Sequence, residues 1–141
     1  MRVKFSLTGD QLRPVTATQS STYDGNAEFV AARCIDGDVG QDHVGHWAIC
    51  ATNSEHYPWI AIDYGKRVTV QNVEIFNRRG CCGNRAKNVH VRVSDKIPSP
   101  NSSDGPFLSG KQLGEPFVGP ADNGATLSFS DKSGKTRCHG I

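Results

Sequence analysis

Short alternations of apolar and polar residues run through the middle of the chain and predict β-strands. Residues 59–64 (WIAIDY) and 88–94 (NVHVRVS) show the two-residue period of a strand, and residues 125–130 (ATLSFS) show it more weakly. Helix-like composition occurs only near residues 27–33, where we expect a helical turn. The stretch between the last two predicted strands is rich in Pro, Gly, Ser and Asp, so we expect long loops there with one or two short strands.

Residues 68–76 (VTVQNVEIF) carry two alternating patterns that are out of phase. Val68 and Val70 lie on one phase, and Val73 and Ile75 lie on the other. A regular strand cannot bury both pairs on one face, because successive side chains point to opposite faces. The shift at the Gln-Asn pair between them predicts a β-bulge or a bend.

Composition favours an all-β fold. The chain has 141 residues, a length typical of one domain, and 15 Gly with 7 Pro, which interrupt helices and mark turns. We expect an antiparallel β-sandwich over residues 16–141, preceded by an N-terminal lead-in over residues 1–15. The net charge of +2 gives no argument for nucleic acid, and no apolar stretch is long enough for a membrane span.

Five cysteines in a short, glycine-rich chain are typical of an oxidising compartment. The first residues lack the apolar run of a signal peptide. We therefore expect an extracellular module of a longer secreted protein. The chain stops soon after Cys138, and we expect the domain to be incomplete at its C-terminus, without a closing strand.

Two of the cysteines, Cys81 and Cys82, are adjacent in the segment NRRGCCGNR. The absence of a C-x-x-C pattern disfavours a zinc site or a thioredoxin-like motif. A disulfide between neighbours would require a distorted or cis peptide and would form a small, rigid, apolar platform. Arg78 and Arg85 flank it, and their forked donors suit adjacent sugar oxygens. Alternatively, the arginines are ordinary surface residues and one cysteine pairs elsewhere.

Three segments, NRRGCCGNR, PWIAIDYG and ATQSSTYDG…ARCIDGD, together resemble the F-type lectins, or fucolectins. These are fucose-binding domains with a discoidin-like jelly-roll fold, and the resemblance covers roughly residues 16–93. It implies a carbohydrate-binding module for fucose or a related terminal sugar. Arg78 and Arg85 match the arginines that hold the sugar, and Cys81 and Cys82 match the joined cysteines that touch its apolar face.

Two positions depart from the family pattern. The family usually has Arg-Gly-Asp before the cysteines, whereas this chain has Arg78, Arg79 and Gly80, so the acidic residue that orients the first arginine is missing. Where the family has a sugar-binding histidine, this chain has Thr52 followed by Asn53. The resemblance assigns the role of the histidine to one of these two residues.

The resemblance also implies a structural calcium ion, which needs several oxygen ligands. The matching ligands are two carboxylates and two backbone carbonyls, from Arg33, Asp36, Asp38 and Ile49. An ordinary Asp-Gly turn is the alternative. We further expect a disulfide between Cys34 and Cys50, which border this loop, and an unpaired Cys138.

Catalytic motifs are missing from the sequence, which has neither G-x-S-x-G nor paired carboxylates in a glycosidase-like context, so we do not expect an enzyme. A single shallow sugar site binds weakly, and we expect oligomers or tandem modules to supply avidity.

Two alternative functions stay open. One is a discoidin-type module that binds protein or lipid head groups, and the other is a redox-sensing thiol pair at Cys81 and Cys82, which needs an intracellular setting.

Overall fold

The computed structural model describes residues 2–7, 14–37, 49–96, 110–132 and 137–140. These residues form an all-β fold with only short 3-10 helices, as the sequence predicts. The strands are β1 (Arg2–Leu7), β2 (Thr16–Gln19), β3 (Ile60–Phe76), β4 (Arg92–Val93), β5 (Lys111–Gln112), β6 (Thr126–Ser130) and β7 (Arg137–Gly140). The helices are η1 (Tyr23–Gly25), η2 (Ala27–Phe29), η3 (Ala31–Cys34) and η4 (Gly83–Arg85).

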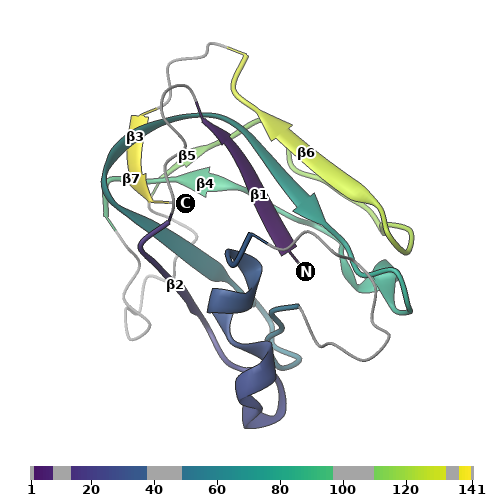
Figure 1. Cartoon of the computed structure of the whole chain (residues 1–141). Helices are drawn as coiled ribbons and strands as arrows, with labels where there is room; N and C mark the ends of the chain where they lie inside the picture. Colours follow the sequence, from purple (N-terminus) through teal and green to yellow (C-terminus); the bar gives the residue numbers. More distant parts are fainter. Residues whose placement is uncertain (1, 8–13, 38–48, 97–109, 133–136, 141) are drawn as a thin grey trace.

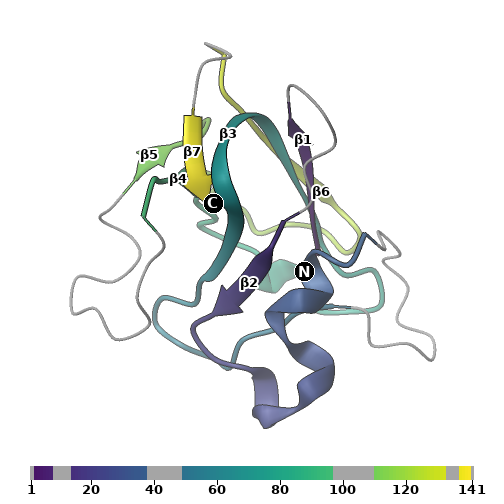
Figure 2. The same cartoon turned by 60° about the vertical axis from the view of Figure 1, so that its left-hand side comes forward.

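β3 is the central strand, and it serves both parts of the main sheet. Its first half pairs with β2 and β7, and its second half pairs with β1 and β6, all antiparallel. Figures 1 and 2 show β3 as an arch whose two ends point toward the same end of the molecule. The bend lies at Gly65, whose φ of 65° favours glycine. The segments before and after β3 therefore meet at one end of the sandwich.

The phase shift predicted in residues 68–76 is a β-bulge in the second half of β3. β1 pairs with Asn72 and then with Val70, so Gln71 is skipped in the register. The extra residue turns the later side chains back to the core face. Val70 and Val73 are consequently both buried, with exposed fractions of 0% and 1%.

The hydrophobic core lies against β3 and is completed by β6 and by the segments around β4 and β5. β6 alternates as predicted and buries Leu127 and Phe129. The predicted strand at residues 88–94 is mostly irregular, since its strand-like parts are β4, a bridge between Val89 and Phe117, and one further bridge residue at Ser94. Val91 and Val93 are nevertheless buried, so the inward phase of this segment is as predicted.

Both ends of the chain contribute strands, which corrects two expectations. The predicted lead-in contains β1, which pairs with the second half of β3. The predicted lack of a C-terminal strand is wrong, because β7 pairs with Val68 and Thr69 of β3. Cys138 belongs to β7, and its side chain lies outside the described residues, so its expected unpaired state stays a prediction.

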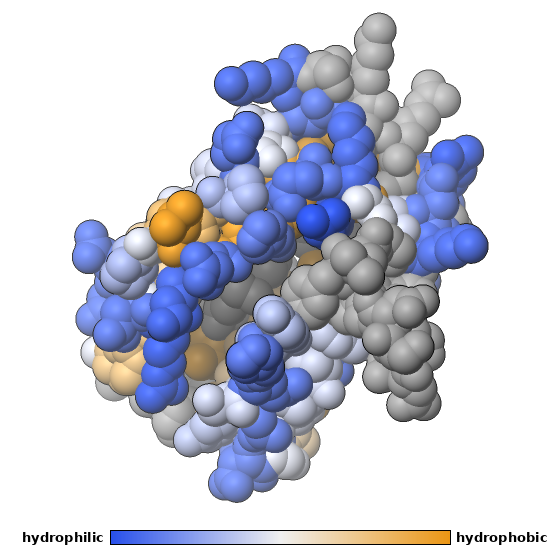
Figure 3. Space-filling view, turned by 180° about the vertical axis from the view of Figure 1, so that it is seen from behind, coloured by the Kyte–Doolittle hydropathy of each residue, from blue (hydrophilic) through white to orange (hydrophobic). Residues whose placement is uncertain are grey.

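The surface has no single apolar face in the view of Figure 3. That face is mainly hydrophilic, and its apolar atoms show as small separate areas. Among the side chains that the structure describes, the large apolar ones that are exposed are Val15, Tyr23, Tyr57 and Val118. Within the described ranges, no helix is long and apolar enough to cross a membrane.

Candidate functional site

The disulfide loop, residues 77–86, begins directly after β3. It contains the bonded pair Cys81 and Cys82, whose Cα atoms lie 3.8 Å apart. This is the spacing across a trans peptide, so of the distorted or cis peptide expected for the pair, the cis form is not present. Instead, Cys82 adopts the left-handed conformation, with φ 61° and ψ 24°. Such a conformation costs a non-glycine residue about 1–2 kcal/mol, and the surrounding loop must hold it.

A buried amide side chain, that of Asn77, closes the loop from inside. Its Nδ2 donates to the carbonyl oxygen of Gly83 at 2.9 Å and to that of Asp122 at 3.0 Å. Its exposed fraction is 7%, and the hydrogen bond to Gly83 is buried while the one to Asp122 is partly buried. One side chain therefore joins the start of the loop to its far side and to a segment before β6.

That second segment, residues 121–125, runs alongside the disulfide loop. The backbone N–H of Gly83 donates to Asn123 Oδ1 at 2.7 Å, and the N–H of Gly124 donates to the carbonyl of Arg78 at 2.7 Å. A Cβ atom on Gly83 would lie only 2.7 Å from the backbone N of Asn123. The two segments are thus in such close contact that only glycine fits at Gly83.

The side chains of the three arginines in this loop lie in different environments. Arg78 is half-buried, and its Nε is buried without a hydrogen-bond partner among the residues that the structure describes. Arg85 is exposed at the end of η4. Arg79 lies across Gly124, because a Cβ there would be 2.9 Å from Arg79 Cγ. A buried N–H normally has an acceptor, and the described residues supply none to Arg78 Nε.

The platform between Arg78 and Arg85 is accessible. Cys81 is exposed and Cys82 is half-buried. The two cysteines and the two arginines that the sequence singles out thus belong to one short loop. A loop that carries forked donors and a compact apolar disulfide has the groups to bind a molecule with both hydroxyl groups and an apolar face.

Thr52 and Asn53 belong to a different set of contacts. Asn53 Oδ1 accepts a hydrogen bond from the N–H of Asp24 at 3.0 Å, and the N–H of Asn53 donates to Ser21 Oγ at 2.9 Å. In the described ranges, neither residue is hydrogen-bonded to the disulfide loop. The arch of β3 does bring their segment to the same end of the molecule as that loop (Figure 1).

The predicted calcium ligands lie near a second disulfide. Cys34 is bonded to Cys50, the pair expected from the sequence, with Cα atoms 5.3 Å apart. Arg33 and Ile49 directly precede these cysteines, so the disulfide draws their backbone together, and Asp36 is exposed nearby in sequence. Asp38 lies outside the described residues. Within them, no group of three or more His, Cys, Asp or Glu side chains could hold a metal ion.

The sequence interpretation missed the two asparagines that support the loop. Asn77 follows the last residue of β3 directly, at the point where the strand alternation ends, and a polar residue there was a usable signal. Asn123 gave no such signal, because the Asp-Asn-Gly sequence around it is typical of an ordinary turn. Its contact with Gly83 spans 40 residues and is created by the fold.

Comparison with known proteins places this geometry in context. Residues 16–99 match the F5/8 type C domain. Fucolectin-1 of Anguilla japonica is 26% identical over 115 residues, which are 80% of this chain and 60% of that protein. The pentraxin fusion protein of Xenopus laevis is 31% identical over 75 residues, which are 53% of this chain and 18% of that protein. The chain thus spans 60% or less of the length of these two relatives.

Solved structures of two lectins share the fold. The crystal structure of an F-lectin (fucolectin) from Morone saxatilis (striped bass) serum has a TM-score of 0.73 and 22% identity, and the match covers 92% of this chain and 40% of that chain. A His 62 mutant of the lectin binding domain of Lectinolysin, complexed with Lewis b, has a TM-score of 0.55 and 23% identity, covering 96% of this chain and 78% of that chain.

Proposed function

Because this chain belongs to the F5/8 type C domain family and has the F-type lectin domain of a carbohydrate-binding module, we propose that it binds fucose or a related terminal sugar through the disulfide loop. The observation that carries this proposal is the pair of arginines on either side of a vicinal disulfide, on a loop fixed by a buried amide.

Each part of the loop has a role in this proposal. Arg78 and Arg85 donate hydrogen bonds to sugar oxygens, and the joined Cys81 and Cys82 pack against the apolar face of the ring. The third polar contact comes from the Thr52 segment, either from the Thr52 hydroxyl or from Asn53 Nδ2, because Asn53 Oδ1 already accepts from Asp24. A rigid loop loses little conformational entropy on binding, which favours affinity for a small ligand.

The setting that we propose is extracellular and non-catalytic. The related striped bass lectin comes from serum, and disulfides of this kind persist in oxidising compartments. The module acts by binding and not by catalysis. Oligomers or tandem copies raise its avidity for surfaces that carry many sugars.

A glycan array tests the sugar-binding proposal directly. We expect wild-type protein, kept oxidised and supplied with calcium, to bind fucosylated glycans. The variant Arg78→Ala/Arg85→Ala should bind roughly a hundredfold more weakly, because it loses two sets of charge-assisted hydrogen bonds. The control Lys66→Ala/Lys132→Ala removes two exposed charges elsewhere and should bind like wild type. Failure of wild type to bind any glycan would contradict the proposal, and binding to lipid vesicles or proteins instead would support the discoidin-type alternative.

We also propose that a structural calcium ion binds beside the Cys34–Cys50 disulfide. The donors would be the carbonyls of Arg33 and Ile49 with the carboxylates of Asp36 and Asp38, and hard oxygen donors suit calcium. The ion would fix the loop near Thr52. We expect added calcium to raise the midpoint of thermal unfolding by a few degrees relative to EDTA, because a ligand of the folded state stabilises it. The Asp36→Asn variant should lose most of this rise, and an unchanged midpoint in wild type would contradict the site.

A further inference from the structure

Asn123 and Gly124 form the one Asn-Gly pair in the sequence. Asparagine is a chemically labile residue, and it is most labile before glycine, because no Cβ hinders attack of the next backbone nitrogen on the side-chain amide. The pair lies in a turn, in which the N–H of Ala125 donates to the carbonyl of Asp122 at 3.2 Å. Asn123 is exposed, so water reaches its amide. The pair therefore has the chemistry of a deamidation site.

The folded structure holds both groups that would react. The nucleophile is the backbone nitrogen of Gly124, and its N–H donates to the carbonyl of Arg78 at 2.7 Å. The electrophile is Cγ of Asn123, and Oδ1 of the same amide accepts from the N–H of Gly83 at 2.7 Å. The first contact keeps the proton on the nucleophile, and the second restricts rotation of the amide. Both partners belong to the disulfide loop, so contact with that loop protects Asn123.

The same contact leaves no room for a longer backbone at position 123. A Cβ on Gly83 would lie 2.7 Å from the backbone N of Asn123, from Asn123 Oδ1 and from the carbonyl O of Asp122. Two of these three atoms are backbone and cannot turn aside as a side chain does. Asn77 Nδ2 also donates to the carbonyl of Asp122 at 3.0 Å. Any added atom in the chain here would therefore disturb the support of the disulfide loop.

We propose that Asn123 is a site of spontaneous deamidation whose rate is set by opening of the contact between the disulfide loop and residues 121–125. In the open state, the Gly124 nitrogen loses its proton to hydroxide and attacks Cγ of Asn123. A C–N bond forms, the bond from Cγ to Nδ2 breaks, and ammonia leaves with a proton taken from water. Water then opens the succinimide ring at either carbonyl and yields aspartate or isoaspartate. The net reaction consumes water and releases ammonia, and it needs no oxidant or other reactant.

The two products have different consequences for the loop. Aspartate keeps the backbone length and has an oxygen that accepts from the Gly83 N–H. Isoaspartate carries the chain through Cβ and Cγ, which adds a carbon atom to the backbone before Gly124. The added atom moves the Gly124 N–H away from the Arg78 carbonyl and forces the two segments apart. Formation of isoaspartate therefore limits the lifetime of the supported loop.

Peptide mapping by mass spectrometry tests the proposal on the intact chain, kept oxidised in mildly alkaline buffer for several weeks. We expect Asn123 to deamidate about tenfold faster in urea-unfolded wild type than in folded wild type, because only the open state reacts. Folded Asn77→Ala and folded Cys81→Ser/Cys82→Ser, which loosen the loop in different ways, should each react faster than folded wild type. The control Asn84→Ala keeps the contacts of the loop and should react at the wild-type rate.

Two results would overturn this part of the inference. One is that Asn123 reacts no faster than the other asparagines in the unfolded chain, and the other is that folded and unfolded wild type react at the same rate. Reaction of both loosened variants at the rate of folded wild type would show that the loop does not control the site.

The consequence of isoaspartate has its own test. The deamidated fraction of aged wild type is isolated by ion exchange, its isoaspartate content is measured by peptide mapping, and its urea denaturation is compared with that of Asn123→Asp. This variant has the added charge but not the longer backbone, and we expect it to unfold nearly as wild type does. The isoaspartate form should unfold at lower urea, and an equal midpoint would overturn the predicted loss of support. Because no glycan is involved, these results are independent of the sugar-binding proposal.

Discussion

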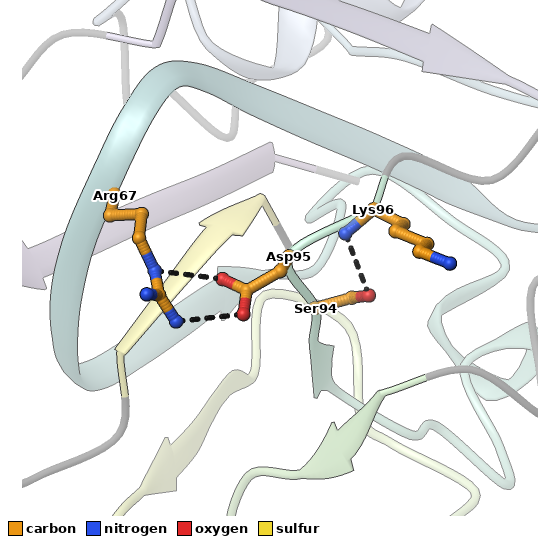
Figure 4. A network of polar contacts seen from close by, with 4 residues as sticks. All are labelled: Arg67, Ser94, Asp95 and Lys96. Carbon is orange, nitrogen blue, oxygen red and sulfur yellow. Dashed lines mark hydrogen bonds and ion pairs between the residues drawn. The ribbon is translucent and has the colours of Figure 1, made fainter.

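Arginines occur both at the bend of β3 and in the disulfide loop after its last residue, but they differ in whether a carboxylate of the chain binds them. At the bend, Arg67 Nε donates to Asp95 Oδ1 at 3.2 Å and its Nη2 donates to Asp95 Oδ2 at 2.8 Å (Figure 4). In the disulfide loop, Arg78 and Arg85 have no carboxylate partner among the described residues. The forked donors of Arg67 are therefore used within the chain, while those of the loop are available to a ligand.

The supports of the two regions differ as well. The Arg67–Asp95 pair lies in water, with side chains that are 65% and 54% exposed. The disulfide loop is held by a buried amide and by backbone contacts with residues 121–125. Exposed ion pairs contribute little to stability, whereas each hydrogen bond from a buried side chain typically contributes about 0.5–1.5 kcal/mol. The region with open arginines is thus the one with the stronger internal support, as a preorganised binding site requires.

Among the substitutions that test this comparison, replacing Asn77 should cause the largest loss of stability and of glycan affinity. Asn77→Ala removes two hydrogen bonds, while the carbonyls of Gly83 and Asp122 keep the backbone N–H groups of Ala86 and Ala125 as donors, so we expect the free energy of unfolding to fall by about 1–3 kcal/mol. Because Asn77 precedes Arg78, we also expect affinity for a fucosylated glycan to fall about tenfold. Urea denaturation and a glycan titration on the same preparation measure both effects.

The matched control is Asn84→Ala, in the same loop. Asn84 is exposed, and its side chain has no hydrogen bond in the described part of the chain, so the stability should change by less than about 0.5 kcal/mol. If Asn77→Ala keeps both the stability and the affinity of wild type, the buried amide does not fix the loop, and its support would have to come from the disulfide alone.

Local pattern predicted much of the fold, because strand alternation depends only on neighbouring residues. The β-bulge in β3 was predictable, since two apolar phases in residues 68–76 cannot share one face otherwise. β7 was not, because the segment RCHG has no apolar alternation and becomes a strand only by pairing with β3. β1 does alternate, at Val3, Phe5 and Leu7, and that signal was overlooked.

In the candidate site, as in the fold, the features that depend on neighbouring residues were predictable and the long-range contacts were not. The pairing of Cys81 with Cys82 and the flanking Arg78 follow from adjacency in the sequence. The contact of Gly83 with Asn123 depends on β3 and β6 lying side by side, which no local pattern specifies. Sequence therefore identified the groups that we propose to face a ligand, and the structure was needed to find the residues that hold them.

Breaking the ion pair at the bend should cause the smallest loss of stability and no loss of glycan affinity, in contrast to the substitution of Asn77. Asp95→Asn keeps one oxygen toward Arg67 but removes its charge, so we expect a loss of about 0.2–1 kcal/mol in the free energy of unfolding. The loss should vanish at about 1 M salt, because exposed charges are screened there. The affinity for fucosylated glycans should not change, since Asp95 lies beside the bend and away from the disulfide loop.

A double-mutant cycle of Asp95→Asn with Arg67→Gln, measured by urea denaturation, isolates the coupling between the two side chains. Lys96 N–H also donates to Ser94 Oγ at 3.1 Å, so the turn that carries Asp95 has a support of its own and should survive both substitutions. A coupling above about 2 kcal/mol would show that the bend needs its ion pair. A fall in glycan affinity would show that β3 transmits the change to the loop. Either result would contradict the division of the molecule into an end that uses its arginine internally and an end that offers its arginines to a ligand.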